Sequence, residues 1–104
     1  MRAIILAAAR TRNIRPTSAV SVLSAADPVR VFQDFAILDL ISKGRAEIVV
    51  GRVLCAEAYP LFGCSMQDYD DLFVEKLELL MALRDQTQIT WRGRFRPPLT
   101  EQAV

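Results

Sequence analysis

The sequence predicts an α/β fold in which a helix connects two parallel strands. The clearest helix signal covers residues 27–42, where Asp27 is a good N-cap and Pro28 occupies the first helical position, at which its missing N–H is not needed. Residues 46–50 form an apolar, β-branched run with little polar alternation, typical of a parallel strand covered on both faces. A strand over 17–23 completes a βαβ unit, whose crossover we expect to be right-handed.

The elements around this unit follow in order. Residues 2–12 are rich in Ala, Leu and Ile and predict a helix that stops near Asn13. The strand that follows Ile14 is expected to begin only at Thr17, because Pro16 cannot donate to a strand ladder. The apolar face predicted for the helix over 27–42 consists of Val31, Phe32, Phe35, Ala36, Leu38 and Ile41. Gly44 is expected to be the left-handed residue that closes this helix.

The second half of the chain predicts one long helix and a hairpin. Pro60 and Gly63 allow only one or two helical turns over 53–62, and Ser65 then caps a helix over about 66–84. Its buried stripe is expected to be Leu72, Phe73, Leu77, Leu80 and either Leu83 or Met81, with Glu75, Lys76 and Glu78 on the solvated side. Residues 88–96 predict two very short strands around Gly93, and residues 97–104 are expected to be an irregular tail.

Composition limits the classes of function. The chain has 104 residues, of which 52% are hydrophobic, so one domain with a packed core is expected. A net charge of +1 gives no reason to expect binding to nucleic acid or to a membrane surface. Arg92, Arg94 and Arg96 fit a solvated edge of the hairpin better than a nucleic-acid contact. No apolar run approaches the roughly 18 residues that a membrane span needs.

The residue types also limit the chemistry. The chain has no histidine, which excludes a histidine general base or a histidine metal ligand within it. Cys55 and Cys64 fit neither a disulfide framework nor a zinc site, so we expect no metal. The apolar segment at residues 1–9 is at the short limit for a signal peptide and is followed by arginines, which favours a cytoplasmic protein. The sequence identifies no catalytic residue.

A candidate binding site lies where the second strand stops, at Gly51 and Arg52. In parallel α/β folds, ligands bind beyond the carboxyl ends of the strands. Gly51 would let a phosphate approach the backbone, and Arg52 could hold that phosphate with its forked donors. The alternative is that Arg52 is a surface arginine paired with a nearby acid such as Glu57.

Two parallel strands alone leave both sheet edges open, so the predicted fold is incomplete. Alternating strands and helices indicate an α/β architecture that continues beyond this chain on both sides. Otherwise the open edges would be covered by a homo-oligomer or by a complementary chain.

Four segments together resemble the luciferase-like flavin-dependent monooxygenases: residues 17–23, 27–31, 38–45 and 49–52. The resemblance extends downstream over Glu57, Phe62-Gly63, residues 69–80 and the Trp91-x-Gly93 hairpin, and so covers nearly the whole chain. It implies a partial (β/α)8 TIM barrel, about two βα units with flanking helices and a small hairpin, as a single partial domain over 1–104.

The same resemblance implies a function. Members of this family bind reduced flavin mononucleotide (FMN) or a deazaflavin coenzyme and use O2 to oxidise a small organic substrate. Carried over to this sequence, Arg52 would contact the cofactor phosphate, Gly51 would allow the close approach, and Ala19 and Val20 would form the floor under the flavin ring. Val53 departs from the family, which usually has a glycine after Gly-Arg. The first two and last four βα units of the family barrel, which would carry much of the substrate pocket, are also absent. We therefore expect a truncated relative without turnover of its own, or, alternatively, a non-catalytic module that self-associates or packs against a partner chain.

Overall fold

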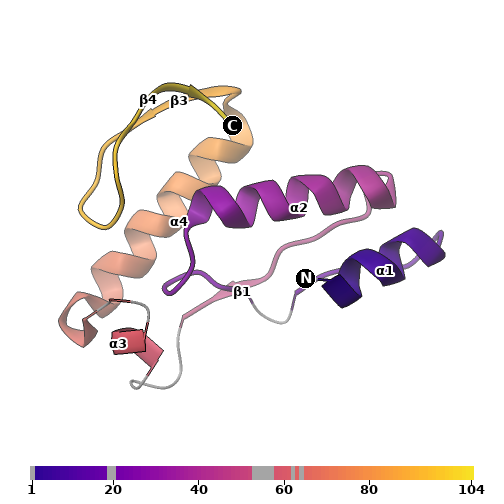
Figure 1. Ribbon diagram of the computed structural model, residues 1–104, viewed down its shortest axis with the longest axis horizontal. Coiled ribbons are helices and arrows are strands. Elements are labelled where there is room, and N and C mark those ends of the chain that lie inside the picture. Colours follow the sequence, from indigo (N-terminus) through magenta and orange to yellow (C-terminus); the bar gives the residue numbers. More distant parts are fainter. Residues whose placement is uncertain (1, 19–20, 53–57, 62, 64) are drawn as a thin grey trace.

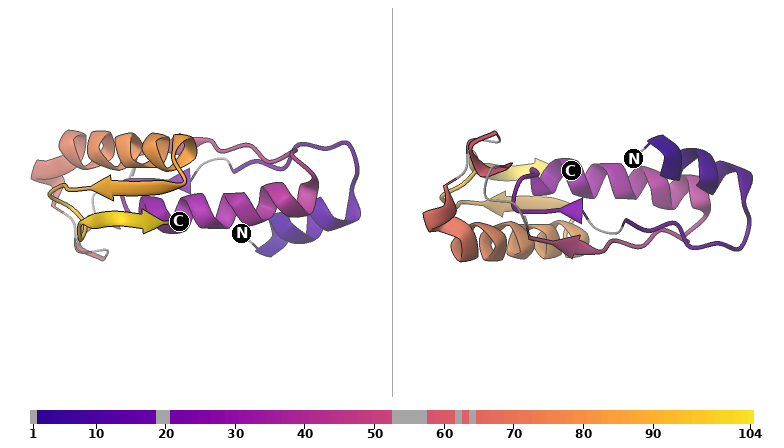
Figure 2. Two further views of the ribbon diagram at one scale, coloured as in Figure 1. Left: turned by 90° about the horizontal axis from the view of Figure 1, so that it is seen from above. Right: turned by 90° about the horizontal axis from the view of Figure 1, so that it is seen from below.

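The structure has three layers: an antiparallel hairpin, a layer of two long helices, and a pair of parallel strands (Figure 1). It is a computed structural model that describes residues 2–18, 21–52, 58–61, 63 and 65–104. The hairpin and the parallel pair lie on opposite sides of the helices, as the two views in Figure 2 show. The Cα radius of gyration is 14.6 Å, larger than the about 13 Å typical of a compact domain of this length.

The predicted βαβ unit is present, and its strands are parallel. Strand β1 (Ser21–Val22) pairs with β2 (Val50–Gly51) in parallel register. Upstream, Thr17 and Glu47 form an isolated parallel bridge, and the Glu47 amide donates to the Pro16 carbonyl at 3.0 Å. Pro16 therefore contributes only as an acceptor, which explains why a strand without its N–H can pair at this point.

Helix α2 (Pro28–Ser42) begins as the sequence predicts, and it is closed by two successive left-handed residues, Lys43 and Gly44, where the sequence predicts Gly44 alone. The Asp27 carboxylate accepts a hydrogen bond from the Val29 amide at 3.4 Å, which is the expected N-cap. At the other end, Gly44 has a φ of +84°, as expected for a closing glycine. Lys43 is left-handed as well, with φ +59°, and is the first left-handed residue after the helix.

Helix α1 (Arg2–Arg10) is held to the rest of the fold by Arg45. Arg45 Nη2 donates to the carbonyls of Ala8 at 2.8 Å and Thr11 at 2.9 Å, at the carboxyl end of the helix. Its Nη1 donates to the Ile14 carbonyl, and its Nε donates to the Ser42 carbonyl at 2.7 Å. One guanidinium thus satisfies carbonyls that a helix end leaves without partners and joins α1 to the end of α2.

The long helix in the second half forms where predicted. A single turn, α3 (Ala58–Leu61), and a 3-10 turn (Met66–Asp68) precede α4 (Tyr69–Asp85). Ser65 caps the 3-10 turn by accepting from the Gln67 amide at 3.3 Å. The buried residues of α4 are Leu72, Lys76, Leu79, Leu80 and Leu83, whereas Met81 is exposed.

Two predictions about the polar side of α4 are wrong. Lys76 is only 8% exposed, because its stem packs in the helix interface and its ammonium group reaches a buried carbonyl. Glu75 is half-buried rather than solvated, because its carboxylate accepts from the amides of Arg94 and Phe95 in the hairpin. Glu78 is exposed, as predicted.

The hairpin forms, but its second strand lies further along the chain than predicted. Strand β3 (Gln88–Trp91) pairs antiparallel with β4 (Leu99–Ala103). The expectation of an irregular tail over 97–104 is therefore wrong. The sequence hides β4 because its residues are mostly exposed and show no apolar alternation, and because Pro97 and Pro98 belong to the connecting loop rather than to the end of the hairpin.

The described residues form three hydrophobic clusters, of which the smallest surrounds Leu72 and the other two lie on the two sides of the α2–α4 layer. The first lies toward the parallel strands, and its buried residues are Ala8, Leu23, Val31, Phe35, Leu38 and Leu80. The second lies under the hairpin, with Leu79, Leu83 and Ile89 buried and Trp91 packed against them. Trp91 thus has the packing role in the hairpin that is usual for an aromatic residue in a short strand. Ile41, expected on the apolar face of α2, is exposed.

The expectation that the strand over 46–50 is covered on both faces is wrong for this chain. Val49 is 44% exposed, because α2 and α4 cover only one side of the strand pair, and Ile48 is 38% exposed although it lies on the helix side. An apolar groove of about 740 Å³ also opens between this strand and the two helices. The two-stranded sheet and its partial cover are what an incomplete barrel predicts. No helix in the described part of the chain is long and apolar enough to cross a membrane.

Candidate functional site

The parallel strands bring the sequence-predicted site to one edge of the sheet. Because β1 and β2 run in the same direction, the residues after Val22 and after Gly51 leave the sheet on the same side. Gly51 is part of the ladder, since its carbonyl accepts from the Leu23 amide at 3.1 Å. Arg52 is the next residue and is half-buried at this edge, where the sequence predicts a ligand contact.

Arg52 packs against the first turns of α4. Its guanidinium carbon lies 5.3 Å from the centre of the Tyr69 ring and 4.8 Å from the centre of the Phe73 ring. These residues are four apart, so both rings lie on the same face of the helix. Its Nη1 also donates to Asp70 Oδ1 at 2.5 Å. The predicted alternative, an arginine paired with a nearby acid, thus describes this contact, with Asp70 as the acid; Glu57 lies outside the described residues.

A buried lysine lies at the same edge, and the sequence interpretation missed it. Lys76 Nζ donates to the carbonyl of Ser24 at 2.8 Å, two residues after the end of β1. A signal for this burial exists in the sequence, because Lys76 stands four residues from both Leu72 and Leu80 and so shares their helix face.

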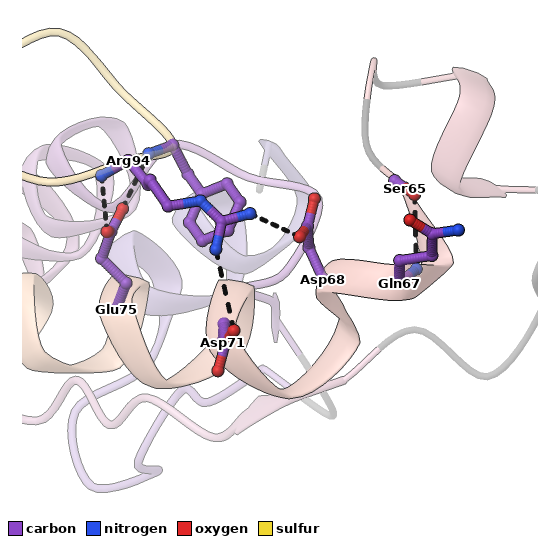
Figure 3. A network of polar contacts seen from close by, with 7 residues as sticks. Ser65, Gln67, Asp68, Asp71, Glu75 and Arg94 are labelled. Atoms are coloured by element: carbon purple, nitrogen blue, oxygen red, sulfur yellow. Dashed lines mark hydrogen bonds and ion pairs between the residues drawn. The ribbon is translucent and has the colours of Figure 1, made fainter.

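The tip of the hairpin is held to the start of α4 and to the 3-10 turn before it through the network in Figure 3. Glu75 accepts from the Arg94 amide at 2.7 Å, and the Arg94 guanidinium pairs with Asp68 at 2.6 Å and Asp71 at 3.7 Å. Arg94 and Arg92 are exposed, as a solvated edge predicts. Arg96 is not, because its side chain is 16% exposed and pairs with Asp27 at 3.0 Å.

Ala19 and Val20, the predicted floor under the flavin ring, lie outside the described residues, as do Val53 and both cysteines. The residues that flank this floor are tied to the sheet. The Ser21 hydroxyl donates to the Ser18 hydroxyl at 2.9 Å, and Ser18 Oγ donates to the Val49 carbonyl at 3.1 Å. Within the described ranges, no group of three or more His, Cys, Asp or Glu side chains is arranged to hold a metal ion.

The family model described as luciferase-like monooxygenase matches residues 3–104. The chain belongs to the luciferase-like monooxygenase family. Two relatives from Sinorhizobium fredii (strain NBRC 101917 / NGR234) are named as uncharacterized proteins. The chain is 33% identical to protein y4wF over 83% of its own length, and 30% identical to protein y4vJ over 82% of its length.

A solved structure in the comparison is also a monooxygenase. The crystal structure of monooxygenase RslO1 from Streptomyces bottropensis matches 94% of this chain with a TM-score of 0.84 and 27% sequence identity. This luciferase-like chain spans 25% and 24% of the lengths of the two Sinorhizobium relatives and 30% of that of RslO1. The predicted family and the predicted fold class, an α/β partial barrel, are therefore confirmed.

The luciferase-like family generally uses reduced flavin or a deazaflavin coenzyme, and the described residues fit one end of such a cofactor. Two aromatic rings fix the position of the Arg52 guanidinium, which meets a solvent-exposed carboxylate at Asp70. An anion approaching from solvent would reach Arg52 from that same direction. This arrangement suits the phosphate end of a flavin nucleotide.

Proposed function

We propose that this chain is a fragment or truncated relative of a flavin-dependent monooxygenase that oxidises a small organic substrate with reduced flavin and O2. Its contribution would be one section of the cofactor site. The observation that carries this proposal is the position of Arg52, directly after β2 at the carboxyl edge of a parallel strand pair, with its guanidinium stacked on Tyr69 and Phe73.

In this proposal, the residues of the chain bind and orient, while the reactivity toward O2 is supplied by the flavin when it is bound. Arg52 would donate to the phosphate of FMN or of a deazaflavin coenzyme. Gly51 would allow the phosphate to approach the backbone, and Ala19 and Val20 would lie beneath the ring. Two hydrogen bonds support this role, because they fix the strand beside that floor: Ser18 Oγ donates to the Val49 carbonyl, and the Val49 amide donates to Ser18 Oγ.

The isolated chain is expected to lack turnover. It spans about a quarter of the length of its curated relatives, and strand residues Ile48 and Val49 are exposed rather than enclosed. A monooxygenase site must exclude water around the reacting centre. The expected result is no flavin-linked or NADH-linked oxidation of an aldehyde or ketone by the purified chain. Measurable turnover by the chain alone would overturn this expectation.

Binding of the cofactor is tested separately from turnover. The purified chain is titrated against FMN, and the quenching of flavin fluorescence is measured for the wild type and for Arg52→Ala. Saturable quenching that Arg52→Ala abolishes supports the proposal. Arg30→Ala is the matched control, since Arg30 is an exposed arginine on α2 and its loss removes the same charge. Equal losses in both variants would point to net charge rather than to a phosphate contact.

A second candidate is a non-catalytic module that self-associates or packs against a complementary chain. It is favoured by the open strand edge and by the apolar groove of about 740 Å³, whose lining includes Phe35, Leu40, Ile48 and Leu80. Sedimentation measurements on the purified chain test it. A dimer or larger assembly that shows no saturable binding of FMN supports this candidate, whereas a monomer that binds FMN supports the first.

A further inference from the structure

The ion pair between Arg52 and Asp70 has a consequence for the proposed phosphate site. Arg52 Nη1 lies 2.5 Å from Asp70 Oδ1, so one donor of the guanidinium is already used. The Asp70 side chain is 77% exposed and that of Arg52 is 38% exposed, so the carboxylate lies on the solvent side of the contact. An anion that arrives from solvent therefore meets Asp70 before it can bind Arg52.

The stacking of Arg52 on two aromatic rings restricts where an anion and the Asp70 carboxylate can bind its guanidinium. Its guanidinium lies over Tyr69 and Phe73, at 5.3 and 4.8 Å from the ring centres. Stacking occupies the flat face of the group and leaves its N–H donors at the edge. A phosphate and the Asp70 carboxylate both bind at that edge, and both prefer its forked donors.

The other acids nearby are occupied elsewhere. Asp68 and Asp71 pair with Arg94, at 2.6 and 3.7 Å, and hold the tip of the hairpin. Among the described residues, Asp70 is the acid that pairs with Arg52. Because the pair is exposed, it is weak and can be displaced.

We propose that Asp70 is a built-in competitor at the anion site of Arg52 and that it sets the affinity of this site for a phosphate monoester. This inference rests on the proposed function, in which Arg52 contacts the cofactor phosphate. Asp70 orients the guanidinium while the site is empty of anion, and it is displaced when the phosphate binds. Neutralising Asp70 removes both the competing acceptor and the repulsion of the incoming dianion.

The test is a fluorescence titration of the full chain with FMN and with riboflavin, which lacks the phosphate. Asp70→Asn is expected to lower the Kd for FMN by about threefold to tenfold, as removal of an exposed pair and of a nearby like charge allows. Its Kd for riboflavin should not change. Asp71→Asn is the matched control. It removes the same charge at the next residue in the chain, and the Asp71 carboxylate pairs with Arg94 rather than with Arg52.

Each outcome bears on one of the two ideas. FMN binding that is lost in Arg52→Gln but not tightened in Asp70→Asn overturns the inference and leaves the proposed function standing. Equal tightening in Asp70→Asn and Asp71→Asn, or tightening for riboflavin as well, also overturns the inference. If no variant binds FMN saturably, the proposed function fails and the inference fails with it. Asp70→Ala should reproduce the tighter FMN binding of Asp70→Asn, and an unchanged Kd in Asp70→Ala would overturn the inference.

Discussion

Lys76 Nζ lies 2.8 Å from the carbonyl oxygen of Ser24, and both residues are buried. The contact joins the middle of α4 to the turn between β1 and α2, across 52 positions of sequence. An ammonium group inside a protein is strongly disfavoured without such partners. The lysine therefore fixes the position of α4 over the carboxyl end of β1, beside the edge at which Arg52 lies.

Replacing Lys76 by alanine should lower the free energy of unfolding by about 2–3 kcal/mol. The change removes a charged hydrogen bond, leaves the Ser24 carbonyl without this donor, and takes away the packing of the aliphatic stem. Urea denaturation followed by circular dichroism measures the effect. Glu78→Ala, on the exposed side of the same helix, should change the stability by no more than about 0.5 kcal/mol. An equal midpoint for Lys76→Ala and the wild type would contradict the structural role given to this lysine.

Glu75 and Gly93 form a second coupled pair. A Cβ at Gly93 would lie 2.6 Å from the carboxylate carbon of Glu75, which accepts from the amides of Arg94 and Phe95. Gly93→Ala must therefore displace that carboxylate, and it should lower the stability by about 1–2 kcal/mol, as the loss of such hydrogen bonds does. In a Glu75→Ala background, the same change should be close to neutral, because nothing is left to displace.

This double-mutant cycle is read from denaturation midpoints of the four proteins. If the effects of Gly93→Ala and Glu75→Ala simply add, the close contact between the two residues does not control the stability of the hairpin. Gly63→Ala is not a suitable control, because Gly63 has a positive φ and an alanine there would be strained for a different reason.

Replacing Arg45 by lysine should lower the stability of the protein. The Arg45 guanidinium donates to the carbonyls of Ala8, Thr11 and Ile14. One ammonium group cannot reproduce the planar arrangement of N–H donors that these bonds require. Arg45→Lys should lower the free energy of unfolding by about 2–3 kcal/mol. Hydrogen exchange should become faster chiefly in α1, the element that this arginine holds. Arg30→Lys, at an exposed position of α2, is the control and should leave exchange in α1 unchanged.

The parts of the fold that were predictable from sequence are those with local causes. Asp27 before Pro28 defines the start of α2 with residues that are adjacent in the chain, and Ser65 does the same for the 3-10 turn that precedes α4. Glu75 and Lys76 were misplaced because their partners are distant: the hairpin for Glu75, and Ser24 for Lys76. The spacing of Lys76 from Leu72 and Leu80 indicates that it lies on the buried face of the helix, but nothing local identifies the Ser24 carbonyl or the hairpin amides as the partners.

At the candidate site too, features with local causes were predictable from the sequence and features that depend on distant residues were not. That Arg52 ends the second parallel strand follows from the apolar run before it, and the structure places it there. Its partner Asp70 is 18 positions away, on a helix whose packing angle no local pattern encodes. Strand β4 was missed for a related reason, since its register is set by pairing with β3 rather than by any alternation of its own.

The end of α2 offers a change that should stabilise the protein. The Lys43 amide donates to the Leu40 carbonyl at 3.3 Å and the Gly44 amide to the Asp39 carbonyl at 2.8 Å, the bonding of a Schellman motif. In this motif, the left-handed position held by Lys43 is usually glycine, because a Cβ there is strained. Lys43→Gly should therefore raise the free energy of unfolding by about 0.5–1 kcal/mol. Gly44→Ala should lower it by about 1 kcal/mol, since Gly44 has φ +84°. Thermal unfolding of both variants measures these changes. A lower midpoint temperature for Lys43→Gly than for the wild type would show that the lysine makes a compensating contact.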